Sequence, residues 1–120
     1  MKNKTLWSLD LCLDLKKCES KKINEDTAKD FAKKLGEFID PDAEIMGVVS
    51  PFGEHEEEMS GLRLVHETSN CLITAHLVNK SKDIFVNIHS CAGYKPSEVI
   101  KISEDFWGPT SYKCQKIFRE

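Results

Sequence analysis

The stretch SGLRLVHETSNCLITAHLVNKSKDIFVNIHSCAGYKP, residues 60–96, carries the pattern that decides the fold. It contains two runs rich in Ile, Val, Leu and Phe, residues 71–78 and 83–91, and the second run alternates apolar with polar side chains. Such runs predict β-strands. The short polar link Asn79-Lys80-Ser81-Lys82 predicts that the two strands form a hairpin.

Two titratable side chains on this hairpin, His76 and Cys91, lie fifteen positions apart. The hairpin places them on neighbouring strands, which is a first indication of chemistry. Each also has a structural interpretation. A cysteine at a strand end is usually a small buried hydrophobe, and a histidine in an apolar run is usually a hydrogen-bonded core residue.

The sequence before this hairpin predicts two strands and a helix. Alternating leucines predict a strand over residues 5–15. Asn24 is a predicted helix N-cap, and the helix should stop before Asp40-Pro41 because the residue before a proline resists the helical conformation. A strand is predicted over residues 43–50, ended by Pro51-Phe52-Gly53. The apolar helix positions are Ala28, Phe31, Ala32, Leu35, Phe38 and Ile39.

Residues 61–67 predict a further strand, residues 97–106 a second helix and residues 110–119 a last strand. The order strand, helix, four strands, helix, strand is typical of an α+β two-layer sandwich, with helices on one face of an antiparallel sheet. The other face, if apolar, needs a second subunit, so we expect a homodimer.

Composition narrows the class of protein. A chain of 120 residues with 40% apolar and 31% charged residues predicts one soluble domain, residues 1–120. The net charge of −3 gives no basic patch for nucleic acid. Asp10 and Asp14 interrupt any signal-peptide core, and no apolar run is long enough to span a membrane, so we expect a cytoplasmic protein.

Cysteine and histidine spacing gives little support for a metal site. The five cysteines are odd in number and include no C-x-x-C, so we interpret them as free thiols. The four histidines form no H-x-x-x-H pair. We therefore predict no metal, although zinc held by cysteine and histidine side chains gathered in space stays open as a minority alternative.

Several motifs resemble those of the small prokaryotic S-adenosylmethionine decarboxylases, which are pyruvoyl enzymes of polyamine synthesis. Asp14-Leu15-Lys16-Lys17-Cys18 is similar to the end of the family's first strand, and Ser60-Gly61 to the start of the strand before its processing site. His76, followed fifteen positions later by Cys91 within Ser90-Cys91-Ala92-Gly93, is similar to the family's catalytic hairpin. The resemblance covers essentially the whole chain.

The resemblance implies a proenzyme that cuts itself and leaves a pyruvoyl group on the new N-terminus. The carbonyl of that group serves as an electron sink for decarboxylation of S-adenosylmethionine or a related amino acid in spermidine synthesis. By analogy, Ser60 and His76 assist processing, with His76 moving protons. Cys91 is then the acid that protonates the decarboxylated carbon.

The bond that would be cut is ambiguous, because the chain has no Glu-Ser in its middle. Counting back from His76 indicates Asn70-Cys71, whereas counting forward from Ser60 indicates Glu67-Thr68. Ser69 is a third candidate nucleophile. A cysteine can perform the same acyl shift, and elimination from it gives the same pyruvoyl group.

Substrate recognition also departs from the family. Leu77-Val78-Asn79-Lys80 replaces the aromatic-Pro-Glu run that usually follows the histidine, and Phe52 is a weak candidate for a stacking surface. Two alternatives follow. One is an unprocessed decarboxylase-like pseudoenzyme that acts as a binding or regulatory partner. The other is an unrelated thiol or metal protein, with candidate residues Cys71, His76, His89 and Cys91.

Overall fold

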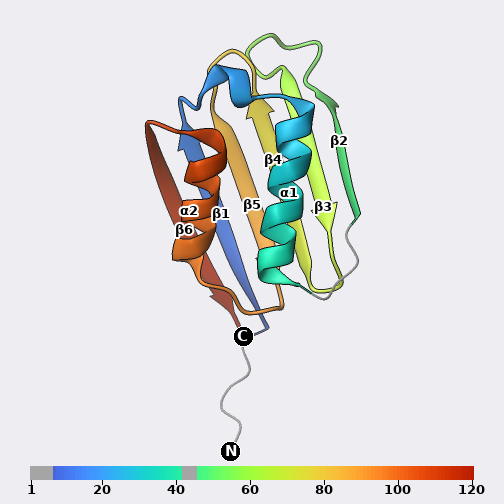
Figure 1. Ribbon diagram of the computed structural model, residues 1–120, viewed down its shortest axis with the longest axis vertical. Coiled ribbons are helices and arrows are strands. Elements are labelled where there is room, and N and C mark those ends of the chain that lie inside the picture. Colours follow the sequence, from blue (N-terminus) through green and yellow to red (C-terminus); the bar gives the residue numbers. More distant parts are fainter. Residues whose placement is uncertain (1–6, 42–45) are drawn as a thin grey trace, which may run out of the picture.

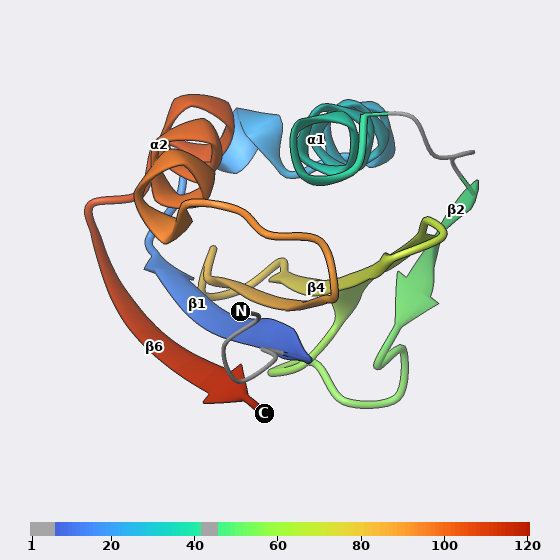
Figure 2. The same ribbon diagram turned by 90° about the horizontal axis from the view of Figure 1, so that it is seen from below.

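The computed structural model describes residues 7–41 and 46–120. In these ranges the chain forms a six-stranded antiparallel sheet with two α-helices on one face (Figures 1 and 2). The strand order is β2-β3-β4-β5-β1-β6. The elements are β1 (Ser8–Lys16), the 3-10 turn η1 (Ser20–Lys22), α1 (Glu25–Ile39), β2 (Met46–Phe52), β3 (Gly61–Glu67), β4 (Cys71–Val78), β5 (Ile84–Ser90), α2 (Pro96–Trp107) and β6 (Ser111–Arg119).

The core lies between the sheet and the helices. Strand β1 alternates strictly, so every second side chain faces the helices, and those of Leu9, Leu11, Leu13 and Leu15 are buried. The side chains of β4 and β5 that face the helices are buried beside these leucines; they are Ile73, Leu77, Ile84, Val86 and Ile88. Figure 2 shows the sheet curving beneath both helices.

Helix α1 begins where the sequence predicts. The side-chain oxygen of Asn24 accepts a hydrogen bond from the Thr27 N–H at 2.8 Å, which satisfies one of the free donors of the first turn. Its buried Phe31 packs edge-on against Phe106 and Trp107 of α2, with ring centroids 5.6 and 5.4 Å apart. This aromatic group joins the two helices.

Helix α2 begins at Pro96, whose missing N–H costs nothing in a first turn. It ends at Gly108, which has a left-handed backbone (φ 58°) and whose N–H donates to the Glu104 carbonyl. Trp107, one residue beyond the predicted end of this helix at residue 106, is the last helical residue and is fully buried.

His66 of β3 lies wedged between α1 and β2, where two glycines make room for its ring. It is 2% exposed. A Cβ atom on Gly36 would lie 2.6 Å from Nε2, and one on Gly47 would lie 2.7 Å from Nδ1. Nε2 has no hydrogen-bond partner among the described residues, and burial lowers the pKa of the imidazole.

The predicted α+β sandwich and its order of elements are confirmed, with local corrections. Phe38 is 38% exposed and does not belong to the core. Strand β2 continues through Pro51 and Phe52, beyond the predicted end at residue 50; an edge strand tolerates a proline because its outer N–H groups need no partner. The predicted starts of the strands at residues 5 and 43 lie outside the described residues.

Candidate functional site

The predicted site residues separate into two groups at opposite ends of the β3–β4 hairpin. In the register, His76 lies opposite Arg63 and Phe85, whereas Cys71 lies opposite Ser90. Five residues along a strand span about 16 Å. His76 lies on β4 and Cys91 directly follows its paired strand β5, but the geometry does not bring the two side chains together within one chain.

The histidine end of the hairpin forms a cavity on the sheet face that the helices leave uncovered. The Nε2 atom of His76 lies 2.9 Å from the Met59 carbonyl oxygen, which can only accept, so Nε2 is the donor of this hydrogen bond. Ser60 follows Met59, and its carbonyl accepts a hydrogen bond from the Asn79 N–H at 2.9 Å. Ser60 and His76 therefore belong to the same end of the sheet.

Phe52 lines this cavity. Its ring packs edge-on against His76 at 4.6 Å between centroids, and the Arg63 guanidinium lies 4.2 Å from its centroid. The cavity has a volume of about 470 Å³ and also contains Phe85. An aromatic ring and a guanidinium side by side can hold a planar group and an anionic group of one ligand.

The other end of the hairpin holds all the cleavage candidates. The turn from Thr68 to Asn70 packs against Asp40, the C-cap residue of α1. One oxygen of Asp40, Oδ2, accepts hydrogen bonds from the Thr68 hydroxyl at 2.9 Å, the Asn70 N–H at 3.1 Å and the Asn70 side-chain amide at 3.2 Å. Thr68 is 8% exposed, whereas Ser69 is exposed.

Cys71 and Cys91 have different environments at this end. Burial raises the pKa of the Cys71 thiol to about 11, and the Asp40 charge adds to the effect while a hydrogen bond with Ser90 opposes it. Cys91 is exposed. Its backbone N–H donates to the Asn70 carbonyl oxygen at 2.8 Å, so the carbonyl of the Asn70-Cys71 bond is already polarised.

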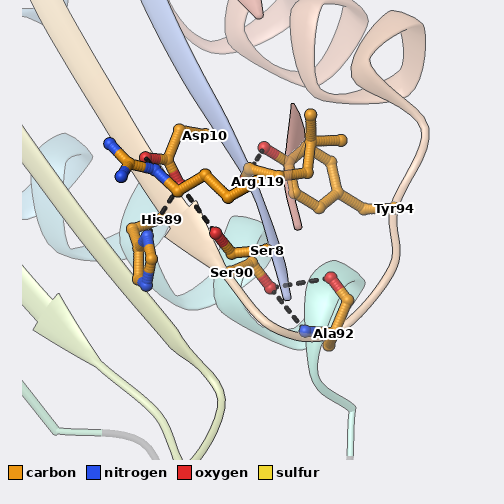
Figure 3. A network of polar contacts seen from close by, with 8 residues as sticks. Ser8, Asp10, His89, Ser90, Ala92, Tyr94 and Arg119 are labelled. Atoms are coloured by element: carbon orange, nitrogen blue, oxygen red, sulfur yellow. Dashed lines mark hydrogen bonds and ion pairs between the residues drawn. The ribbon is translucent and has the colours of Figure 1, made fainter. Parts of the chain in front are cut away.

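The turn after β5 is held by its own hydrogen bonds (Figure 3). The Ser90 hydroxyl donates to the Ala92 carbonyl at 2.8 Å and accepts from the Ala92 N–H at 3.0 Å. The Tyr94 hydroxyl donates to the Leu9 carbonyl at 3.2 Å. Cys91 therefore lies in an ordered turn beside a cavity of about 240 Å³ that also contains Tyr94.

A polar network on the uncovered face was not predicted from sequence. Asp10 Oδ1 lies 2.6 Å from His89 Nδ1, and Arg119 Nε lies 2.6 Å from Asp10 Oδ2 (Figure 3). Burial alone would raise the pKa of Asp10, but the hydrogen bonds and charges of Arg119 and His89 outweigh it and hold that pKa below its usual value. The alternation of β1 places Asp10 on this face, whereas its partners depend on a register that the sequence does not reveal.

Asp40 and Arg63 were also missed as site residues. The sequence around Asp40 predicts only the end of a helix, and its position one residue before a proline does not indicate the turn that packs against it. Within residues 7–41 and 46–120, no three His, Cys, Asp or Glu side chains are grouped so that they could hold a metal ion. The same ranges contain no helix of the length and apolarity needed to cross a membrane.

The chain is similar in fold to proteins of known structure. No protein-family model matches the chain, and no curated protein matches it. The fold is similar to the crystal structure of the adenosylmethionine decarboxylase from Aquifex aeolicus VF5, with a TM-score of 0.75 and 17% sequence identity over 98% of this chain and 92% of that chain. At this identity the likeness shows that the two proteins share a fold.

Proposed function

We propose that the protein is a self-processing, pyruvoyl-type decarboxylase acting on adenosylmethionine or a related amino acid in polyamine synthesis, in the cytoplasm. The observation that carries this proposal is the likeness to an adenosylmethionine decarboxylase over nearly the full length of both chains. The β3–β4 turn supports it, since hydroxyl and thiol side chains are gathered where a chain could cut itself.

The residues of this turn fit the formation of a ketoacyl group. Thr68, Ser69 and Cys71 each carry a nucleophile on the β-carbon, as the acyl shift and the later elimination both require. Such a group supplies an electron sink for loss of carbon dioxide from an amine-bearing substrate. Cys91 is the proposed proton donor. Its thiol is exposed, and its own backbone N–H donates to the Asn70 carbonyl, which places it next to the cleavage candidates.

A homodimer explains why the proposed residues lie at both ends of the sheet. If two chains pack their uncovered faces together about a two-fold axis that runs across the strands, the end of one sheet meets the opposite end of the other. The turn with Cys91 in one subunit then approaches the partner subunit's His76, Phe52 and Arg63. Each dimer would contain two composite sites, with His76 moving protons and the aromatic and cationic side chains holding substrate.

Intact mass and substrate turnover test the function. We expect the purified protein to give two fragments under denaturing conditions, with the C-terminal fragment blocked by a ketoacyl group. We also expect it to release carbon dioxide from carboxyl-labelled adenosylmethionine. An uncut chain that stays uncut on long incubation would overturn the proposal and favour a pseudoenzyme.

Complementation tests the composite site. His76→Ala and Cys91→Ala should each be inactive, because each removes one half of both sites. Co-expression of the two variants should restore about a quarter of the wild-type activity, since half of a random mixture is heterodimer and each heterodimer retains one complete site. Folded dimers that remain inactive together would show that the two ends do not share a site.

A further inference from the structure

We propose that the chain is cut between Glu67 and Thr68, that Asp40 is the base for this cut, and that the group formed is 2-oxobutanoyl rather than pyruvoyl. This inference rests on the proposed function, since it names the nucleophile of the same processing site. It starts from the contact of the Thr68 hydroxyl with the Asp40 carboxylate at 2.9 Å.

The three candidate nucleophiles differ in the bases available to them. Thr68 donates its hydroxyl proton to a carboxylate, which is the arrangement that activates a weak oxygen nucleophile. Ser69 is exposed, and no described residue accepts from its hydroxyl. Cys71 is a protonated thiol at neutral pH whose hydrogen-bond partner, Ser90, is no base. Of the three, Thr68 is therefore the one prepared for attack.

The surroundings of Thr68 favour the acyl shift over hydrolysis. Thr68 is 8% exposed, which limits access of water to its hydroxyl. Two further hydrogen bonds from Asn70 fix Asp40 Oδ2 in place, so the carboxylate meets the hydroxyl in one orientation. The Asn70 contacts alone would hold the turn, and the contact with Thr68 adds an activated hydroxyl.

The steps balance with water as the only added reactant. Thr68 Oγ1 attacks the Glu67 carbonyl carbon, Asp40 takes the hydroxyl proton, and the C–N bond between Glu67 and Thr68 breaks as its nitrogen gains a proton. The product is an ester with a free amine. Loss of the Thr68 α-proton then expels the Glu67 α-carboxylate and leaves a dehydrobutyrine.

Tautomerisation of the dehydrobutyrine gives an imine, and addition of water releases ammonia. Because threonine carries a β-methyl group, the product at residue 68 is a 2-oxobutanoyl group. Its keto carbon is the same electron sink that a pyruvoyl group provides. The extra methyl group gives the cut a mass signature that neither Ser69 nor Cys71 can produce.

Intact mass of the full chain tests the inference. We expect one fragment of residues 1–67 with a free carboxylate and a second of residues 68–120 that begins with 2-oxobutanoyl. Thr68→Ser should be cut at the same bond, and its C-terminal fragment should be one methylene lighter because it begins with pyruvoyl. Thr27→Ser is the matched control, because it lightens the N-terminal fragment and leaves the cut unchanged.

The base is tested by Asp40→Asn, with Asp30→Asn on the exposed side of the same helix as control. The amide oxygen that replaces the carboxylate can still accept from Asn70, so the turn is held, but cleavage should slow by about 100-fold. The unfolding midpoint of each variant, measured alongside, separates loss of a base from loss of the fold.

The outcomes distinguish this inference from the proposed function. A cut before Ser69 or Cys71 with a ketoacyl group would leave the decarboxylase proposal intact and overturn the assignment of Thr68. Cleavage of Asp40→Asn at the wild-type rate would overturn the role of Asp40. A chain that is never cut would overturn both.

Discussion

Replacing Gly36 with alanine should destabilise the protein, although the same change stabilises most helices. Alanine in a helix interior is favoured over glycine by about 1 kcal/mol. Here the new Cβ atom would lie 2.6 Å from Nε2 and 3.1 Å from Cδ2 of His66. The ring has little room to move away, because Gly47 lies against its other side and the residue is 2% exposed. Overpacking of this kind costs about 1–3 kcal/mol, so we expect a net loss between about 0 and 2 kcal/mol, centred near about 1 kcal/mol.

Urea unfolding followed by circular dichroism measures this change, and His66→Ala supplies the control background. Once the ring is gone, Gly36→Ala has no clash and should recover the ordinary stabilisation of about 1 kcal/mol. The sign of the effect should therefore reverse between the two backgrounds. A higher unfolding midpoint for Gly36→Ala alone would show that His66 is free to move, and would refute the wedged position described for it.

Three further predictions concern stability and reactivity. Phe31→Ala should lower the free energy of unfolding by about 3–5 kcal/mol, measured by urea unfolding, since it removes the aromatic contact between the helices. Asp10 has a lowered pKa in the folded state, so it contributes stability above about pH 4 that is lost as pH falls through the folded pKa. Arg119→Gln removes one cause of the lowered pKa, so it should flatten the acid limb of a curve of stability against pH. Iodoacetamide should modify exposed Cys91 before buried Cys18, as measured by peptide mass spectrometry. Burial and the nearby Asp83 charge raise the pKa of the Cys18 thiol to about 11, so little reactive thiolate is present there.

Local patterns explain why so much of the fold could be predicted. The alternating leucines of β1 and the capped, proline-ended α1 each specify their own conformation over a few residues, so no distant contact is needed. Strand β4 matches its predicted bounds for the same reason. Element order then left few ways to bury all the apolar faces.

The site was harder to predict because it depends on contacts between distant residues. Sequence spacing linked His76 with Cys91, but antiparallel pairing places the end of β4 beside the start of β5, so the two side chains lie far apart. Asp40 meets Thr68 across 28 positions, and Asp10 meets Arg119 across 109. No local pattern encodes either pairing.

The position of β1 has a consequence for when the proposed cut could take place. Strand β1 pairs with residues 84–90 on one side and residues 111–119 on the other, so neither side of β1 can pair until the last part of the chain has been synthesised. Pairing over such separations makes folding slow. After a cut in the β3–β4 turn, the N-terminal piece would still hold β1 between β5 and β6 of the C-terminal piece, with β3 paired to β4 (Figure 1). The two pieces would stay one folded body, but only if the chain folds first and is cut afterwards.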